Sequence, residues 1–337
     1  MKIPALIDTH VHLRDFNQSD KATIETETQA AIAGGYSVIC GMPNSVPVLD
    51  NLEMLKEFKK RTSNQPILIY PICAITKGLN SNEIVDFEEF QKEGAIAFSN
   101  DGRPIEDMGL MREVLSKAKE SKSLIISHAE CFEYEPEDNK SEYKAVEREL
   151  EALKDTKSRL HFAHISTKES VELIRDAKMD NHFVTAETAP HYFSLTEEDR
   201  GYDGRFKMNP PLRSVSDVNA IIEGLQDGTI DCIATDHAPH RIDEKIKPYE
   251  EAPFGIVGLE TALSVSYTYL VYRELLDMEE LIEKMSSNPA MILGIDVPDK
   301  FIEFDPEYSY RVDEGKLKSK CKITPYNKMF LKGKIND

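Results

Sequence analysis

The chain has 337 residues, of which 40% are hydrophobic and 30% are charged, and its formal net charge is −19. This length can bury a large core, and the acidic balance argues against a nucleic-acid or anionic membrane surface, since such surfaces need clustered Lys and Arg. The sequence contains no run of 18 apolar residues, so it predicts no transmembrane helix. The five scattered cysteines lack the spacing of a disulfide framework or a structural zinc site.

Eight short apolar runs rich in β-branched residues recur along the chain and predict buried parallel strands. These runs span residues 5–12, 36–44, 66–75, 94–101, 123–130, 159–166, 182–191 and 231–240. Helical patterns between them span residues 21–35, 108–121, 167–178 and 214–228. Eight strands that alternate with helices predict a (β/α)8 TIM barrel, which we place at residues 1–295. A doubly wound open sheet is the alternative, but it does not explain polar residues at the ends of so many strands.

The pattern changes after Asn288. Residues 296–337 show short β segments and turns, and we expect them to form a small C-terminal β extension beside the barrel. Residues 240–255 follow the last expected strand and are a candidate lid. Residues 133–149 are typical of a solvated loop that runs into a helix.

Histidines and carboxylates lie near the ends of several expected strands. His10 and His12 are two residues apart on the first strand, and because such side chains share a face, both imidazoles can reach one metal ion. His128, His164 and Asp236 lie near the ends of the fifth, sixth and eighth runs. The active sites of TIM barrels are built at this end of the strands, so we expect these five side chains to converge.

Five converging nitrogen and carboxylate ligands suit zinc or another first-row divalent metal, and they exceed one tetrahedral site. They therefore predict two metal ions with a shared bridging group. The fourth run ends with Asn100 and Asp101, and only Asp101 offers an anionic group with two oxygens. Each of these residues also has a structural interpretation when taken singly, for example Asp236 as a helix cap, so the prediction depends on their common location.

Seven motifs resemble those of the type I dihydroorotases in the amidohydrolase superfamily. They are H-x-H-x-R at His10, GMPNSVP at Gly41, ISHAE, AHISTKES, KMNPPLR, ATDHAPH, and APFGIVGLETAL at Ala252. The resemblance spans residues 5–294 in the family's motif order. It implies a TIM barrel and an enzyme of pyrimidine (UMP) biosynthesis that interconverts N-carbamoyl-L-aspartate and L-dihydroorotate.

The resemblance also implies a role for each metal ligand. The first zinc ion would be held by His10, His12 and Asp236, and the second by His128 and His164. Asp101 and a hydroxide would bridge the two ions. The hydroxide would attack the amide, with Asp236 acting as general base and then as general acid.

Contacts with the substrate are implied in the same way. Arg14 would bind the substrate carboxylate through its guanidinium, with Asn44 and His240 completing the pocket. The ring would be contacted by Asn209 and by the backbone at Phe254 and Gly255. Taken alone, Arg14 would be interpreted as a surface ion-pair residue, and Asn209 as a loop residue held by the prolines after it.

Four further residues have structural or supporting interpretations. We expect His161 in the core or behind a ligand, His182 in a connection, and His191 behind the site. Glu187 on the seventh strand is expected to orient a metal ligand.

Two features depart from the family pattern. Relatives carry part of a β-sandwich before the H-x-H strand, so here the sandwich would be absent or reduced to the C-terminal extension. Asn100 stands where relatives commonly have the first residue of Asp-Asp-Gly, and we place the bridge at Asp101. Many superfamily relatives bridge with a carboxylated lysine, and the absence of lysine from this run favours the type I branch.

Two alternatives remain open at this stage. The chain could be another cyclic amidohydrolase of the hydantoinase or allantoinase type, or a non-catalytic scaffold for aspartate transcarbamoylase, although a scaffold would be expected to lose metal ligands. We expect a small-molecule substrate, a homodimer or a complex with aspartate transcarbamoylase, and no nucleic-acid or membrane partner. The first residues lack a signal-peptide core, so we expect a cytoplasmic protein with free thiols.

Overall fold

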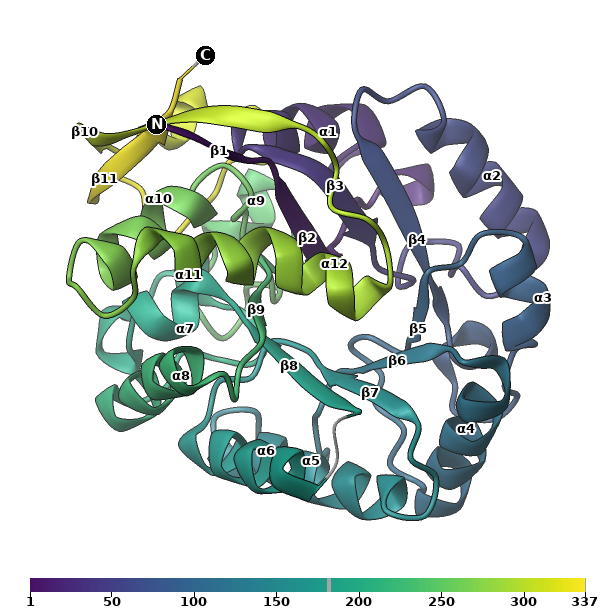
Figure 1. Ribbon diagram of the computed structural model, residues 1–337. Coiled ribbons are helices and arrows are strands. Elements are labelled where there is room, and N and C mark those ends of the chain that lie inside the picture. The colour runs from purple at the N-terminus through teal and green to yellow at the C-terminus, as the bar shows by residue number, and fades with distance from the viewer. Residues whose placement is uncertain (181–182, 337) are drawn as a thin grey trace.

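Eight parallel strands form the centre of the molecule. The computed structural model describes residues 1–180 and 183–336 and orders these strands in one sheet, each beside its neighbour in the chain (Figure 1). They are β2 (Leu6–Val11), β3 (Tyr36–Gly41), β4 (Leu68–Ala74), β5 (Ala97–Ser99), β6 (Leu124–Ser127), β7 (Arg159–Phe162), β8 (Val184–Thr188) and β9 (Cys232–Ile233). The ring closes where Val11 bridges His237 and the His12 amide donates to the His237 carbonyl at 2.8 Å. The predicted TIM barrel is therefore confirmed.

Helices surround the ring of strands in Figure 1. They are α1 (Ile24–Ala33), α2 (Leu52–Thr62), α3 (Phe87–Lys92), α4 (Met108–Ser121), α5 (Asn139–Leu153), α6 (Lys168–Asp180), α7 (Pro190–Ser194), α8 (Val215–Asp227), α9 (Ile242–Lys245), α10 (Ala262–Ser266), α11 (Met278–Ile282) and α12 (Asn288–Leu293). Shorter 3₁₀ and π segments are η1 (Phe16–Gln18), η2 (Lys77–Leu79), η3 (Glu197–Asp199), η4 (Gly204–Phe206), η5 (Tyr267–Val271), η6 (Glu283–Ser287) and η7 (Glu314–Lys316). Side chains of Thr23, Asn51, Asp107 and Ser214 cap four helices by accepting from the backbone amide three residues later.

Two apolar layers stabilise the barrel. Because side chains alternate along a strand, Leu6 points outward against the helices while Ile7 points into the barrel. Helix α12 adds Ile292 to the inner layer, and the Arg159 guanidinium at the start of β7 donates to the Ile292 carbonyl. The amino end of the barrel is thus covered by α12, and the polar residues after the strands lie at the other end.

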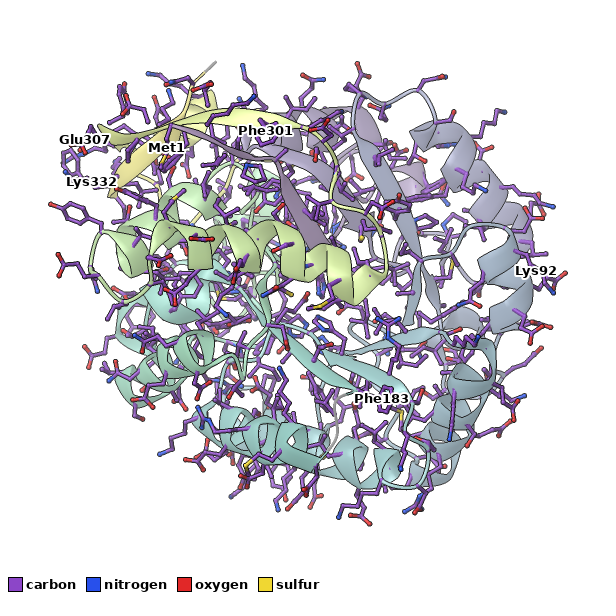
Figure 2. All side chains as sticks on the ribbon, in the orientation of Figure 1. Met1, Lys92, Phe183, Phe301, Glu307 and Lys332 are labelled. Atoms are coloured by element: carbon purple, nitrogen blue, oxygen red, sulfur yellow. The ribbon has the colours of Figure 1, made fainter. Side chains whose placement is uncertain are left out.

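Both ends of the chain meet in a small antiparallel sheet of three strands. The strand β1 (Lys2–Pro4) pairs with β10 (Phe301–Arg311), which pairs with β11 (Phe330–Ile335). Figure 2 labels Met1 and Phe301 on this sheet, with Glu307 and Lys332 toward its outer end, and the Met1 amine donates to the Phe304 carbonyl at 2.6 Å. The C-terminal residues do form β structure, and β1 joins them from the other terminus. The division at residues 295 and 296 stays a prediction.

Two of the predicted loop segments can be compared with the structure. Helix α5 begins at Asn139 within the predicted loop-to-helix segment, and α9 lies in the candidate lid. His182 lies outside the described residues. Within the described part of the chain, no helix combines the length and the hydropathy needed to cross a bilayer.

Candidate metal centre

His10 and His12 come from the carboxyl end of β2. Glu187 Oε1 lies 3.0 Å from His10 Nδ1, and Asn44 Oδ1 lies 2.8 Å from His12 Nδ1. Because both partners are acceptors, each Nδ1 donates to its partner, and Nε2 is the ring nitrogen that faces the carboxylates of the cluster. The two Nε2 atoms lie 3.5 Å and 3.2 Å from the same oxygen, Oδ1 of Asp236.

His128 and His164 follow β6 and β7. Glu130 Oε2 accepts from His128 Nε2 at 3.0 Å, so Nδ1 is the ring nitrogen that faces the cluster. That Nδ1 lies 2.9 Å from Nε2 of His164. The backbone at His164 has a φ of 36°, and the buried Glu142 holds the following turn by accepting from the Ser166 amide at 3.1 Å.

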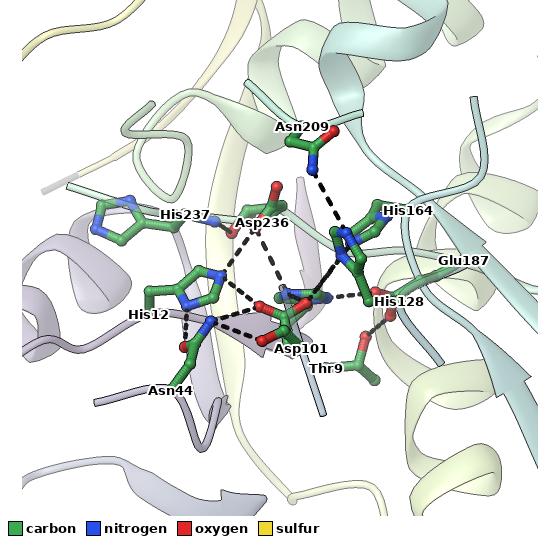
Figure 3. Close-up of polar contacts among 12 residues, drawn as sticks. Thr9, His12, Asn44, Asp101, His128, His164, Glu187, Asn209, Asp236 and His237 are labelled. Atoms are coloured by element: carbon green, nitrogen blue, oxygen red, sulfur yellow. Dashed lines mark hydrogen bonds and ion pairs between the residues drawn. The ribbon is translucent and has the colours of Figure 1, made fainter. Parts of the chain in front are cut away.

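Asp101, in the loop after β5, lies between His12 on one side and His128 and His164 on the other (Figure 3). Its Oδ1 lies 3.5 Å from His10 Nε2, 3.3 Å from His128 Nδ1 and 3.7 Å from His164 Nε2. Its Oδ2 lies 3.5 Å from His12 Nε2. With Asp236, the structure therefore brings all six predicted metal ligands into one buried cluster.

Asn100, the residue before Asp101, makes a different set of contacts. Its Oδ1 accepts from the backbone amides of Ile75 and Thr76 at 3.1 Å each, and its Nδ2 donates to Thr76 Oγ1 at 2.8 Å. These bonds join the loop after β4 to the end of β5. The departure from the Asp-Asp-Gly pattern thus falls on a residue that holds two loops together.

Asp236 follows β9 in a left-handed backbone conformation, with a φ of 47°. Burial favours its neutral form, but the hydrogen bond with His12 and the charges of His10, His12 and His164 outweigh burial and lower its pKa to about 2. The carboxylate is therefore ionised at neutral pH.

The carboxylates of the cluster have the opposite effect on the histidines. Burial disfavours the charged form of His10, but Asp101, Glu187 and Asp236 outweigh it and raise its pKa to about 9. Burial also disfavours the charged form of His128, but Asp101 and Glu130 outweigh it and raise the pKa of His128 to about 10. The cluster thus stabilises positive charge at its centre.

The donor set fits divalent metal ions. His10 Nε2 is buried and has no hydrogen-bond partner among the described residues. Imidazole nitrogens and carboxylate oxygens at this spacing are the ligands that zinc prefers. Two groups of three, each with its ligand atoms within 4.8 Å of one another, share one carboxylate: His10, His12 and Asp101, and Asp101, His128 and His164.

A basic group lies beside the cluster. Arg14 Nε donates to the Pro239 carbonyl at 3.3 Å, and its Nη2 lies 3.1 Å from His240 Nε2. Lys21 Nζ lies 3.1 Å from the other ring nitrogen of His240. Burial, followed by the charges of Arg14 and Lys21, lowers the pKa of His240 to about 2, so the ring is neutral. Among the described residues, Arg14 forms no ion pair with a carboxylate, which leaves its charge available to an anion.

One cavity of about 720 Å³ joins the metal cluster to this basic group. At its edge, Asn209 Nδ2 donates to Glu130 Oε2 at 3.2 Å. Gly255 has a φ of 126°, and a Cβ there would lie 2.6 Å from the Ala238 carbonyl oxygen, so the chain requires glycine. The cavity is lined by every predicted site residue except His10, namely His12, Arg14, Asn44, Asp101, His128, His164, Asn209, Asp236, His240, Phe254 and Gly255.

Two residues that lie in or beside the site, Glu130 and Lys21, are not predicted from the sequence. Glu130 lies two residues after His128, and period-two spacing at the end of a strand was a signal for it. Lys21 is 219 residues from His240, and no local pattern connects the two. The supporting residue Glu187 was predicted, and it also lies 3.1 Å from Nε2 of the buried His161.

Comparison with known proteins identifies the family. The family model described as "Dihydro-orotase-like" matches residues 1–143. A dihydroorotase of Thermoanaerobacter sp. (strain X514) is 42% identical over 99% of this chain and 83% of the relative. The chain belongs to the dihydroorotase family. A dihydroorotase of Desulforapulum autotrophicum is 41% identical over 99% of this chain and 84% of the relative.

Solved structures agree on the fold. An L-hydantoinase (dihydropyrimidinase) from Arthrobacter aurescens has a TM-score of 0.89 at 24% identity, covering 99% of this chain and 83% of that one. A D-hydantoinase from a Thermus sp. has a TM-score of 0.84 at 21% identity, covering 99% and 82%. Membership of the dihydroorotase family makes the chain a hydrolase of the class that acts on cyclic amides.

Proposed function

We propose that this chain catalyses the dihydroorotase reaction, the reversible closure of N-carbamoyl-L-aspartate to L-dihydroorotate with release of water. The choice of substrate rests on the surroundings of Arg14. It is a cation without a carboxylate partner among the described residues, and it lines the same cavity as Asp236. A guanidinium in this position suits the carboxylate that both compounds carry, and uncharged cyclic amides would leave it unpaired.

Asp236 is the proposed proton carrier. In the hydrolytic direction, water attacks the ring carbonyl carbon, and Asp236 takes a proton from that water. The same proton then passes to the ring nitrogen as the carbon–nitrogen bond breaks. Asp236 is ionised at neutral pH and its carboxylate lines the cavity, so it is ready to accept this proton.

We propose two zinc ions as the cofactor. One would be held by His10, His12 and Asp236, and the other by His128 and His164, with Asp101 shared between them. Bound metal supplies Lewis-acid polarisation of the amide carbonyl and lowers the pKa of water. The Nδ1 bonds to Glu187 and Asn44, and the Nε2 bond to Glu130, fix which nitrogen of each ring is the ligand.

The remaining contacts hold the substrate. Arg14 would bind the substrate carboxylate, and the neutral His240 beside it would act as a further hydrogen-bonding group. Asn44 would complete this side of the pocket. The ring would lie against Asn209 and against the backbone of the last two predicted contacts, Phe254 and Gly255.

Turnover of L-dihydroorotate by the zinc-supplemented chain, followed by ultraviolet absorbance, tests this function. We expect activity in the wild type and a loss of at least about 100-fold in kcat for Asp236→Asn. Asp231→Asn is the matched control, because Asp231 lies at the amino end of β9 and bonds to Lys178 instead. A wild type that hydrolyses hydantoin or allantoin but leaves dihydroorotate unchanged would assign the site to a different cyclic amide.

We also propose a cytoplasmic location, which the five free cysteines support. A homodimer or a complex with aspartate transcarbamoylase is proposed as the assembly. Size-exclusion chromatography with light scattering, with and without that partner, distinguishes the two.

A further inference from the structure

Asp236 lies between two anchored neighbours. On one side, Thr235 Oγ1 donates to Asp8 Oδ2 at 2.6 Å and the Thr235 amide donates to Asp8 Oδ1 at 3.1 Å. On the other side lies His237, whose carbonyl accepts from the His12 amide at 2.8 Å. The left-handed φ of Asp236 is costly for a residue with a side chain, so these neighbours must hold it in place.

The side chain of His237 is fixed by contacts on both ring nitrogens. Its Nδ1 accepts from the Gly258 amide at 3.1 Å. Its Nε2 therefore carries the proton and donates to Glu27 Oε2 at 2.6 Å. Both His237 and Glu27 are fully buried, with 1% and 0% of their surfaces exposed. Without the Glu27 carboxylate, this buried N–H would have no acceptor.

Glu27, on α1, also contacts the C-terminal part of the chain. Its other oxygen accepts from the Lys320 amide at 3.2 Å and from Thr26 Oγ1 at 2.7 Å. The same segment is fastened nearby, since Glu260 accepts from the Ser319 amide at 3.0 Å. Glu27 thus connects α1 and the C-terminal segment to the residue directly after Asp236.

We propose that Glu27 is a positioning residue, which holds His237 and thereby sets the place of the Asp236 carboxylate in the cluster. This inference rests on the proposed function, because it concerns the residue that moves the proton. Glu27 does not line the cavity, so it acts only through His237. Its contribution is orientation: a carboxylate that shifts within the cluster no longer reaches both the water and the ring nitrogen.

The test compares Glu27→Leu and Glu27→Gln in the full, zinc-supplemented chain. We expect Glu27→Leu to lower kcat for L-dihydroorotate by about 10- to 100-fold with KM unchanged. Losses of this size are typical when a residue that orients a metal ligand is removed. Glu27→Gln keeps an acceptor for His237 Nε2 and should restore most of the loss. In a His237→Leu background, adding Glu27→Leu should cause no further fall in kcat, because the two residues act as one unit.

Asp231→Asn is the control for a merely structural effect. Asp231 accepts from the Ala186 amide at 2.8 Å at the opposite end of the barrel, so its loss should lower the melting temperature and leave kcat unchanged. An active wild type with an unchanged kcat in Glu27→Leu overturns this inference alone. So does a Glu27→Gln variant that is no better than Glu27→Leu. A wild type that leaves L-dihydroorotate unchanged overturns the proposed function and this inference together.

Discussion

Asn44 Nδ2 donates to Asp101 Oδ2 at 2.7 Å, while Oδ1 of the same amide lies 2.8 Å from His12 Nδ1. One amide therefore orients a histidine of the first ligand group and the carboxylate that lies between both groups. The sequence predicts Asn44 only as a substrate contact. These two hydrogen bonds give Asn44 a second role, the orientation of metal ligands, which does not depend on substrate.

The Asn44→Ala variant should bind zinc more weakly. Both His12 and Asp101 would lose a partner that fixes their orientation, and such outer partners are worth about 10- to 100-fold in metal affinity. Competition with a chromophoric chelator measures this affinity. Asn51→Ala is the control, since Asn51 caps α2 on the surface and should cost stability only. Equal zinc affinity in the wild type and Asn44→Ala would contradict the prediction.

The neighbours Asn100 and Asp101 should give opposite results. Asp101→Asn removes the shared anionic ligand, so zinc bound per chain should fall while the melting temperature of the metal-free chain changes little. Asn100→Ala leaves the Thr76 amide without its acceptor and the Ile75 amide with only the Ser99 carbonyl at 3.3 Å, so unfolding should become easier by about 1–3 kcal/mol. Elemental analysis and urea denaturation separate the two. Loss of zinc in Asn100→Ala with unchanged stability would mean that Asn100, and not Asp101, is the shared ligand.

Arg14→Met should reduce kcat/KM for L-dihydroorotate by about 10- to 100-fold, because a hydrogen bond to a charged group is worth about 1.5–3 kcal/mol. Arg103→Met is the matched control. Arg103 lines the same cavity but is exposed, so water screens its charge and the change should be far smaller. Steady-state kinetics at fixed ionic strength measure both variants. Equal losses would mean that net charge at the cavity mouth, and not a specific carboxylate contact, controls binding.

Much of this architecture could be predicted from the sequence because its signals are local. The eight apolar runs mark the strands, and in a closed parallel barrel the carboxyl ends of all strands share one rim. Residues as distant as His10 and Asp236 could therefore be placed together without any knowledge of their contacts. The sequence favours Asp101 over Asn100 because only Asp101 is anionic and because the register of the family motif places the bridge there. The contacts of Asn100 give a structural reason for its amide.

The rest depends on contacts between distant segments. Strand β1 pairs with β10 about three hundred residues away. A strand of three residues is too short for its sequence pattern to predict which strand it pairs with. The bond from His237 to Glu27 joins a rim loop to a helix whose acidic residues otherwise read as a solvated face. Such pairs follow from the packing of whole elements, so a single sequence does not specify them.

Lys245 predicts a pH dependence of stability that is separate from the metal cluster. Its Nζ donates to the Lys207 and Pro253 carbonyls at 2.9 Å each, and only 1% of the residue is exposed. Burial, followed by the charge of Lys207, lowers its pKa from the ordinary 10.5 to about 7. Between these values the unfolded chain binds more protons at this lysine than the folded chain does. The contribution of Lys245 to the free energy of unfolding must therefore rise with pH from about 7 to 10.5, and it is least favourable below pH 7.

The Lys245→Met variant removes this titration. The difference in unfolding free energy between wild type and Lys245→Met, measured in urea from pH 6 to pH 10, should shift in favour of the wild type as the pH rises above 7. The exposed Lys247→Met is the control, and its difference from the wild type should stay flat across the same range. A flat difference for Lys245→Met as well would mean that the buried amine keeps its proton throughout. In that case the two carbonyls compensate for its loss of water more fully than burial alone implies.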